Sequence, residues 1–595
     1  MKRNDVPIEL TWNLKDLYET ETLFEEDLAL LLKEAKNLEG LELLLMSTEE
    51  LEDFLQRYEN YFVRLYKLSS FASLDLSVDR INSALQQREA RIADLSSELS
   101  ARLSYILSDL HKIPEEKLLE LANFSPRYQV FIHDLIRQRP HRLGDETEKT
   151  LNALGGTFEL PYLTYEMIKL ADMHFGDFEV DGKIYPMNYI LYENDYCQSP
   201  NRNLRRGAYE HFYKTIGTYS YGMGSGYLSH VKTEKILSKL RGFESVTDYL
   251  LFEQEVSRDI YETHLQRMME KLSPVMQKYA GFIKKYYGLD ELYYSDLKAL
   301  IDADFSPEIS LEEAKTDVEK ALSPLGEEYS EIVRGALNNR WIDFAQNKGK
   351  STGGFCASPY GCHSFILMSW TGYLSDAFTM AHEIGHAGHF QLAGQNQNFF
   401  SVNPSTYFVE APSTYNELFL TDYLFEKESS LRNKRYVIAS LLGNTYYHNF
   451  VTHFLEACFQ KQVYDSLDAQ KGLTTDSLHE IKRSVLKEFW KDSVIIDDKA
   501  GYTWMRQPHY YMGLYPYTYS AGLSLATNAY LALKKGEITT EDWLKTLRAG
   551  GSKNPGELAQ IVGINLLEPV SLDRSIDYVD RLVDELISLS ERIEE

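Results

Sequence analysis

The chain has 595 residues, more than one hydrophobic core usually supports, so at least two subdomains are expected. Its 89 acidic against 62 basic residues give a formal charge of -27, which opposes the phosphate neutralisation that drives nucleic-acid binding and excludes that class of partner. Apolar runs such as residues 41–47 fall far short of the roughly 20 residues that a membrane span needs, so no membrane insertion is expected.

Cysteine usage and the first residues both indicate a reducing compartment. The cysteines are few for this length and form no CxxC pair: Cys197, Cys356, Cys362 and Cys458. Residues 1–20 carry charges but neither the apolar segment nor the small-residue cleavage site of a signal peptide. The sequence therefore predicts a cytoplasmic protein.

The N-terminal third has the periodicity of helices. Ser47 and Glu50 have the spacing of a capping box at the start of a helix. Apolar residues from Ile81 to Leu110 then recur at helical multiples until Pro114 stops the run. We predict a helical bundle or helical hairpin lobe.

A β-hairpin is predicted at residues 178–187, where Asp181-Gly182 can supply the positive φ angles of a tight turn between alternating segments. We expect this hairpin to end an N-terminal helical lobe of residues 1–195. Helical patterns resume in a second domain, residues 196–595, and continue to about residue 340. A glycine-rich loop at 346–355 interrupts them, and the apolar run 364–370 is predicted as a strand.

Residues 381–390, AHEIGHAGHF, contain the strongest chemical signal. On a helix, His382 and His386 project from one face and can bind the same ion, while Glu383 can reach a water on that ion. This is the HExxH arrangement of zinc peptidases, in which the glutamate is the general base. The alternative is a histidine-rich surface helix or a buried histidine pair. Gly385 favours the metal site, because glycine weakens a helix that has no packing reason for it.

A catalytic zinc needs a third protein ligand and an open position. Glu410 lies far enough after His386 for the first helix to end and for a second, antiparallel helix to reach the same site. Glu417, two turns further on, can hydrogen-bond a ligand histidine. His389 competes as third ligand, but three ligands from one helix would strain to surround one ion, so a packing role or a supporting contact to a metal ligand suits it better.

The segments HEIGHAGH (382–389) and FVEAPSTYNE (408–417) resemble those of the oligoendopeptidase F branch of the thimet-oligopeptidase-like zinc peptidases. The likeness extends over nearly the whole chain, from TWNLKDLY (11–18) to LRAGGSKNPGELAQIVGINLLEP (547–569). It implies a mainly α, two-lobed enzyme with a deep substrate channel and a small β element beside the HExxH helix. It also implies one zinc ion held by His382, His386 and Glu410, with Glu383 as general base.

The family pattern further places a histidine and tyrosines opposite the zinc. The matching segment, residues 506–522, offers His509 and a run of tyrosines, and the spacing aligns with thimet oligopeptidase only if a gap is allowed. We favour His509, Tyr515 and Tyr519 as donors to the developing oxyanion and expect the other tyrosines to be core or channel wall.

The predicted function is zinc-dependent hydrolysis of internal peptide bonds in short unfolded oligopeptides. Strand 364–370 would bind the peptide backbone as an added strand. An exopeptidase with the same zinc chemistry and a catalytically silent peptide-binding protein are the alternatives; Glu383 argues against the latter, because metal binding alone does not need it. Cys356 and Cys362 flank the predicted strand. They could make activity sensitive to oxidation, but buried inert thiols are expected there.

Overall fold

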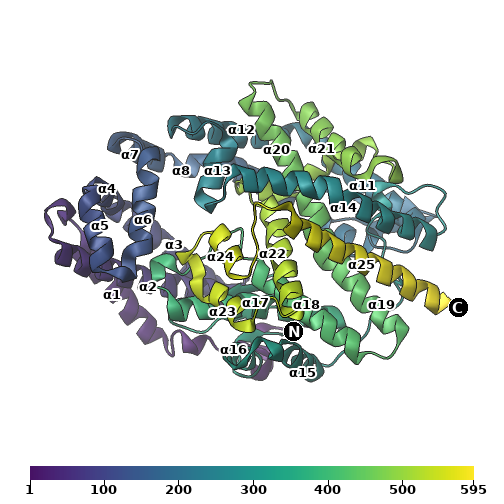
Figure 1. The fold of residues 1–595 in the computed structure, drawn as a ribbon, viewed down its shortest axis with the longest axis horizontal. Coiled ribbons are helices and arrows are strands. Elements are labelled where there is room, and N and C mark those ends of the chain that lie inside the picture. Colours follow the sequence, from purple (N-terminus) through teal and green to yellow (C-terminus); the bar gives the residue numbers. More distant parts are fainter. Residues whose placement is uncertain (595) are drawn as a thin grey trace.

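Helices dominate the structure, a computed structural model that describes residues 1–594, and the predicted mainly α fold is confirmed (Figure 1). The N-terminal helices gather at one end of the molecule. They are α1 Glu21–Leu38, α2 Thr48–Val78, α3 Ser83–Leu103, α4 Tyr105–Lys112, α5 Glu115–Phe124 and α6 Gln129–Gln138. The predicted capping box starts α2: Glu50 N–H donates to Ser47 Oγ, and Ser47 N–H donates to Glu50 Oε2. The helical run ends at Lys112, before Pro114.

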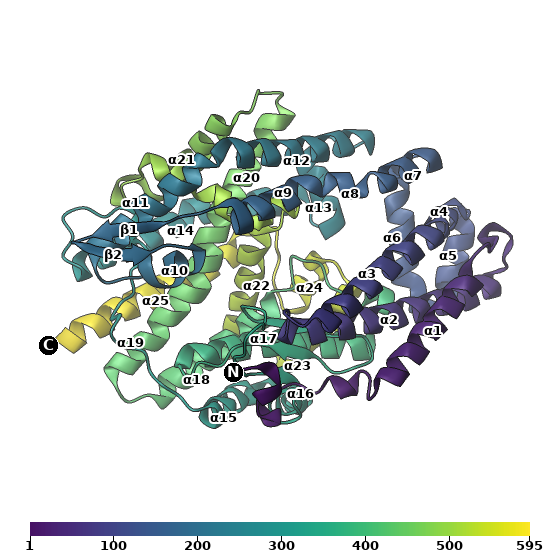
Figure 2. The same cartoon turned by 180° about the vertical axis from the view of Figure 1, so that it is seen from behind.

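Short helices lead from this group to the predicted hairpin, which lies at the opposite end of the molecule (Figure 2). They are α7 Asp145–Ala153, α8 Gly155–Phe158, α9 Leu160–Met167 and, after the hairpin, α10 Tyr189–Leu191. Strands β1 Asp177–Val180 and β2 Lys183–Pro186 pair antiparallel. Asp181 and Gly182 form the turn with φ of 51° and 75°, so the predicted turn is confirmed.

The remaining helices build the larger part of the molecule, where α14 and α25 run side by side (Figures 1 and 2). The first set is α11 Arg202–Thr218, α12 Ser220–Leu240, α13 Val246–Gln254, α14 Arg258–Tyr286, α15 Leu311–Leu322 and α16 Glu327–Asn338. The second is α17 Leu374–Asn396, α18 Ala411–Lys427, α19 Leu431–Ser440, α20 Phe454–Asp468, α21 Thr475–Trp490, α22 Pro516–Lys534, α23 Thr540–Ala549, α24 Pro555–Ile561 and α25 Pro569–Glu594. None of the helices described is long and apolar enough to cross a membrane.

A small three-stranded sheet precedes α17. Its strands are β3 Ile342–Asp343, β4 Phe355–Ala357 and β5 Phe365–Leu367, in the spatial order β3-β5-β4. The predicted strand at 364–370 exists as the shorter β5, but its predicted role as the strand that receives substrate is wrong. β5 is buried and paired on both sides, parallel to β3 and antiparallel to β4. The two edge strands are β3 and β4.

Two hydrophobic cores lie on either side of this sheet. The smaller contains buried residues from Trp12 to Leu135 together with Phe365 and Leu367 of β5, and the larger contains residues from Tyr165 to Leu589. Phe178 of the hairpin packs in the larger core, so the change from one core to the other falls between Leu135 and Tyr165. The division of the chain at residue 195 stays a prediction.

Candidate active site

Helix α17 carries the HExxH segment, and its first turn is held by a side chain. The Asp376 carboxylate accepts hydrogen bonds from Thr371 N–H at 2.6 Å and Gly372 N–H at 2.9 Å. A carboxylate at this position also stabilises the positive end of the helix dipole. The helix that presents the histidines therefore starts at a defined residue directly after the sheet.

Two glycines let neighbouring helices approach α17 closely. A Cβ atom on Gly385 would lie 2.4 Å from the Ser413 Cα, and one on Gly388 would lie 2.4 Å from the Tyr329 ring. The backbone of α18 therefore touches α17 at the turn between the two histidines. This contact is the packing reason for Gly385 that the metal interpretation requires.

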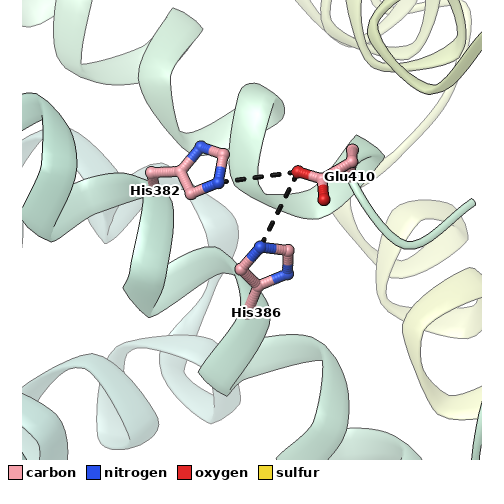
Figure 3. Close-up of side chains that lie close together, drawn as sticks. All are labelled: His382, His386 and Glu410. Atoms are coloured by element: carbon pink, nitrogen blue, oxygen red, sulfur yellow. Dashed lines mark ion pairs between the residues drawn. The ribbon is translucent and has the colours of Figure 1, made fainter. Parts of the chain in front are cut away.

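The close approach brings Glu410, at the N-terminus of α18, opposite the histidine pair (Figure 3). Glu410 Oε2 lies 3.5 Å from His382 Nε2 and 3.7 Å from His386 Nε2. One ligand atom from each of the three residues lies within 4.8 Å of the others. Two imidazoles and a carboxylate that converge in this way are a donor set that suits zinc.

Glu417 holds the His382 ring on the side away from Glu410. His382 Nδ1 and Glu417 Oε1 are 2.6 Å apart, which confirms the predicted contact, and the second carboxylate oxygen accepts a hydrogen bond from the Thr445 hydroxyl. This contact leaves Nε2 of His382 directed at Glu410, as a metal ligand requires.

The charges of the site also fit a metal ion. Burial lowers the pKa of His382, but its hydrogen bond to Glu417 and the nearby carboxylates outweigh burial and raise that pKa to about 10. The carboxylates thus attract positive charge to the point where the ligand atoms meet. Burial lowers the pKa of His386 to about 4, which keeps this imidazole neutral and able to donate a lone pair.

Glu383 is buried, and its Oε2 atom has no hydrogen-bond partner within residues 1–594. Burial raises the pKa of this carboxyl to about 7. Glu383 lines the same cavity as the ligand set but is not among the converging ligand atoms. Glu383 therefore lies beside the three converging side chains without joining them.

His389 lies in the core and not at the site. It is 0 % exposed, and its ring packs edge-on against Phe408 at 5.4 Å. Neither ring nitrogen has a hydrogen-bond partner in the described part of the chain. His389 therefore packs in the core, which is one of the two roles expected for it, and Glu410 is the residue that converges with His382 and His386.

A cavity of about 590 Å³ opens beside these side chains. The His382 face of α17 forms one wall, and Phe355 and Cys356 of β4, together with the preceding Gly354, contribute to the lining. His448, Asn449 and Tyr519 line it as well. Burial raises the pKa of the Cys356 thiol to about 12, which matches the inert thiol expected there.

Tyr519 lines this cavity and is one of the three residues predicted to donate hydrogen bonds to the oxyanion. The rings of His509, Tyr515 and Tyr519 lie 5.2–5.6 Å apart, centroid to centroid. Tyr510 and Tyr517, by contrast, are buried in the larger core, and Tyr517 donates to Gln254. The structure thus brings together the three residues that the sequence favoured.

Three polar residues behind Tyr519 were not predicted from the sequence. His453 Nδ1 donates to Glu456 Oε2 at 2.8 Å, and its Nε2 shares a hydrogen bond of 3.0 Å with His448 Nε2. The Tyr519 ring stacks on His453 with a centroid distance of 4.1 Å and an interplanar angle of 14°. The spacing of these residues, HNFVTHFLE, was the available signal.

The histidine pair, the Glu410 carboxylate and the buried Glu383 form an arrangement that is typical of a metallopeptidase. The family model described as Peptidase family M3 matches residues 196–578, and the one described as Oligopeptidase F matches residues 109–175. Oligopeptidase PepF of Bacillus subtilis is 25% identical over 100% of this chain and 89% of its own length. The plasmid oligoendopeptidase F of Lactococcus lactis subsp. cremoris is 25% identical over 99% of both chains.

Solved structures share the fold. One from Chlamydophila abortus has a TM-score of 0.87 at 21% identity, covering 99% of both chains. Oligoendopeptidase-F from Enterococcus faecium has a TM-score of 0.72 at 21% identity, covering 96% of this chain and 99% of its own. The chain belongs to peptidase family M3, whose model spans more than half of it. It is a metallo-endopeptidase, and its substrates are oligopeptides.

Proposed function

We propose that this metallo-endopeptidase holds one zinc ion with His382, His386 and Glu410 and hydrolyses internal bonds of oligopeptides with Glu383 as general base. The convergence of the three ligand side chains within 4.8 Å is the observation that carries the proposal. The orientation of His382 by Glu417 supports it. Bound zinc would act there as a Lewis acid toward the scissile carbonyl.

Glu383 would act first as the general base and then as the general acid of the reaction. It accepts a proton from the attacking water and passes it to the nitrogen of the leaving amine. A pKa raised to about 7 by burial suits both steps, because a base works best when its pKa lies near the working pH. Its free Oε2 atom, which lacks a partner among residues 1–594, is available for that water.

Tyr519 would donate a hydrogen bond to the oxyanion that develops on the carbonyl. Burial raises the pKa of this phenol, so it keeps its proton at neutral pH. His509 and Tyr515 pack around it and would assist or position it. Donors that are already in place before the reaction stabilise the transition state without having to reorganise.

Strand β4 would bind the peptide backbone. It is an edge strand of its sheet, and Phe355 and Cys356, with Gly354 just before them, line the cavity beside Glu383. A Cβ atom on Gly354 would lie 3.0 Å from Glu383 Oε1, a tight contact, so glycine at this position leaves room for the Glu383 carboxylate. Pairing through main-chain atoms would tolerate many side chains.

The first experiment uses an acetylated, amidated peptide of ten residues and identifies its products by mass spectrometry, with and without a chelator. We expect internal fragments that disappear when the chelator is present. An intact peptide would contradict the endopeptidase proposal, and the same peptide with free termini would then distinguish an exopeptidase from a silent binder.

The Glu383→Gln variant tests the role of the base. Glutamine keeps the size of the side chain but cannot accept the proton, so we expect turnover to fall by about 10²–10⁴-fold. Metal content, measured by elemental analysis, should stay at one zinc per chain. Retained turnover would show that Glu383 is not the base, and loss of zinc would show that it is a ligand.

We also propose a cytoplasmic location, because the cysteine usage indicates a reducing compartment. All four cysteines are free thiols in the structure, which is compatible with this location.

A further inference from the structure

A second cavity lies in the larger part of the molecule, and its lining residues form a different set from those of the catalytic cavity. Its volume is about 60 Å³, several times the roughly 10–15 Å³ that one water molecule needs. Its walls come from α11, α20, α21 and the short helical segments η8 Tyr192–Tyr196 and η14 Asp498–Arg506. Three basic side chains line it: Lys298, Lys482 and Arg506.

Lys482 is the most unusual of the three. Its side chain is 3 % exposed, and its Nζ donates only to the Leu455 carbonyl, at 3.3 Å. Among residues 1–594 no carboxylate lies within 4.0 Å of the Lys482 ammonium group, although Glu456 acts on it from further away. Lys298, by contrast, is exposed. An ammonium group buried without a direct ion-pair partner is costly, and proteins normally pair such groups or bind an ion with them.

The guanidinium group of Arg506 lines the same cavity, and among residues 1–594 not all of its N–H donors have a hydrogen-bond partner. One terminal nitrogen donates to the Tyr213 hydroxyl at 2.8 Å, and the other pairs with Glu193. The Nε–H group is buried and has no hydrogen-bond partner within the described residues. The guanidinium therefore retains a donor for a further acceptor.

The carboxylates nearby are already engaged. Glu456 lines the cavity but accepts the hydrogen bond from His453, and Glu193 is paired with Arg506. Three cationic side chains thus line the cavity, whereas both of these carboxylates already have hydrogen-bond partners. Burial lowers the pKa of Lys482 to about 8, and the Glu456 carboxylate opposes part of that shift.

We propose that this cavity binds a small oxyanion, such as inorganic phosphate or the carboxylate of a small acid, between Lys298, Lys482 and Arg506. Ammonium and guanidinium groups form short charge-assisted hydrogen bonds with such oxygens. The phenols of Tyr294 and Tyr447 line the same cavity and offer neutral donors beside the cations. The anion would supply the counter-charge for Lys482.

Isothermal titration calorimetry of the full-length, metal-loaded protein tests this site with inorganic phosphate, acetate and chloride in turn, at constant ionic strength. We expect saturable binding of one phosphate or one acetate per chain, and the tighter of the two identifies the oxyanion class. Chloride, which offers no oxygen acceptors, should bind at least tenfold more weakly. Equal binding of all three anions would overturn the oxyanion assignment.

Variants locate the site. Lys482→Met removes the buried charge at nearly constant volume, and we expect at least a tenfold loss of affinity. Its melting temperature without added anion should equal or exceed that of the wild type, because an unpaired buried charge is gone. Lys298→Met should also weaken binding. The matched control is Lys487→Met, which changes an exposed lysine on the same helix, α21, and should leave affinity unchanged.

Two further results would overturn the proposal: no binding of phosphate or acetate by the wild-type protein, or wild-type affinity in both Lys482→Met and Lys298→Met. Neither result depends on hydrolysis. The titration can be repeated with the Glu383→Gln variant, so failure of the anion site and failure of the proposed peptidase mechanism are separate outcomes.

Discussion

Gly385 illustrates how one missing side chain sets the distance between the helices that carry the ligands. Alanine at this position would place a Cβ atom 2.4 Å from the Ser413 Cα, and backbone atoms cannot move aside as a flexible side chain can. We therefore expect Gly385→Ala to separate α17 from α18, to destabilise the protein by about 1–3 kcal/mol and to weaken metal binding. Thermal unfolding and a zinc competition titration measure the two effects.

Gly394 provides the matched control on the same helix. No heavy atom that the structure describes lies within 4 Å of the Cβ it would gain. Because alanine favours a helix over glycine by about 1 kcal/mol, Gly394→Ala should keep or raise stability and leave zinc affinity unchanged. If the two variants behaved alike, close helix contact at Gly385 would not explain the site.

His389 should make the protein sensitive to acid. Burial lowers the pKa of its imidazole to about 3 from 6.5. Between these values the unfolded chain binds more protons than the folded one, so the free energy of unfolding falls as the pH falls below 6.5. His389→Leu cannot be protonated and should gain stability over the wild type by about 1.4 kcal/mol for each pH unit of that decrease.

Denaturant unfolding of wild type and His389→Leu at pH 7.5, 6 and 5 measures this effect. The difference between the two proteins should grow toward pH 5, and zinc content should be unchanged. A constant difference would contradict the buried neutral imidazole. Loss of zinc in the variant would restore His389 as a candidate ligand.

At the scale of the residue, spacing was sufficient to predict most of the site. His382 and His386 are four residues apart on a regular α-helix, so their convergence follows from helix geometry alone. Glu410 and Glu417 were found because a second helix had to supply the third ligand. The contact that seats this helix, Gly385 against Ser413, depends on tertiary packing, and spacing does not contain it.

Among the elements, the segment η12 Leu441–His453 explains why His448 and His453 escaped prediction. It is a π-helix, in which residues five apart are hydrogen-bonded neighbours. On an α-helix the same residues would point about 140° apart, at 100° per residue. The sequence offers no local signal for π-helical winding, so the hydrogen bond between the two histidines could not be foreseen.

This element should matter for catalysis because His453 supports the Tyr519 ring. Glu456 and His448 hold the two nitrogens of His453, and Tyr519 stacks on its face at 4.1 Å. We expect His453→Ala to lower kcat by about 10–100-fold with a smaller change in KM, since it would loosen Tyr519 without removing a ligand. Zinc content should be unchanged.

A double-mutant cycle with Tyr519→Phe tests this coupling. If His453 acts by positioning Tyr519, the two losses in kcat overlap, and the double variant is little worse than Tyr519→Phe alone. Losses that multiply independently would contradict the positioning role.

The small sheet shows a different limit of sequence reading. The apolar run at 364–370 correctly predicted a strand, but strand order depends on partners distant in sequence. Phe355 to Ala357 pair with β5 on one side only, and this leaves β4 at the edge. A run such as SFILMSW, apolar without alternation, is typical of a strand buried on both faces, and that property argued against an edge position.

Over the whole molecule, β5 connects the two hydrophobic cores. Phe365 and Leu367 belong to the smaller core, and Ile366 between them belongs to the larger one. This follows from the alternation of side chains along a strand. Chain length predicted more than one core, but a strand shared by two cores requires the three-dimensional arrangement.

The shared strand predicts that neighbouring substitutions act on different halves of the molecule. Ile366 and Leu367 are both 0 % exposed, so alanine at either position should cost about 2–5 kcal/mol. Leu367→Ala should increase hydrogen exchange in α2 and α5 of the smaller core, and Ile366→Ala should increase it in α16 and α17 of the larger core. Hydrogen exchange followed by mass spectrometry resolves these helices. If both variants loosened the same helices, the two cores would unfold as one unit, and the boundary between Leu135 and Tyr165 would have no energetic meaning.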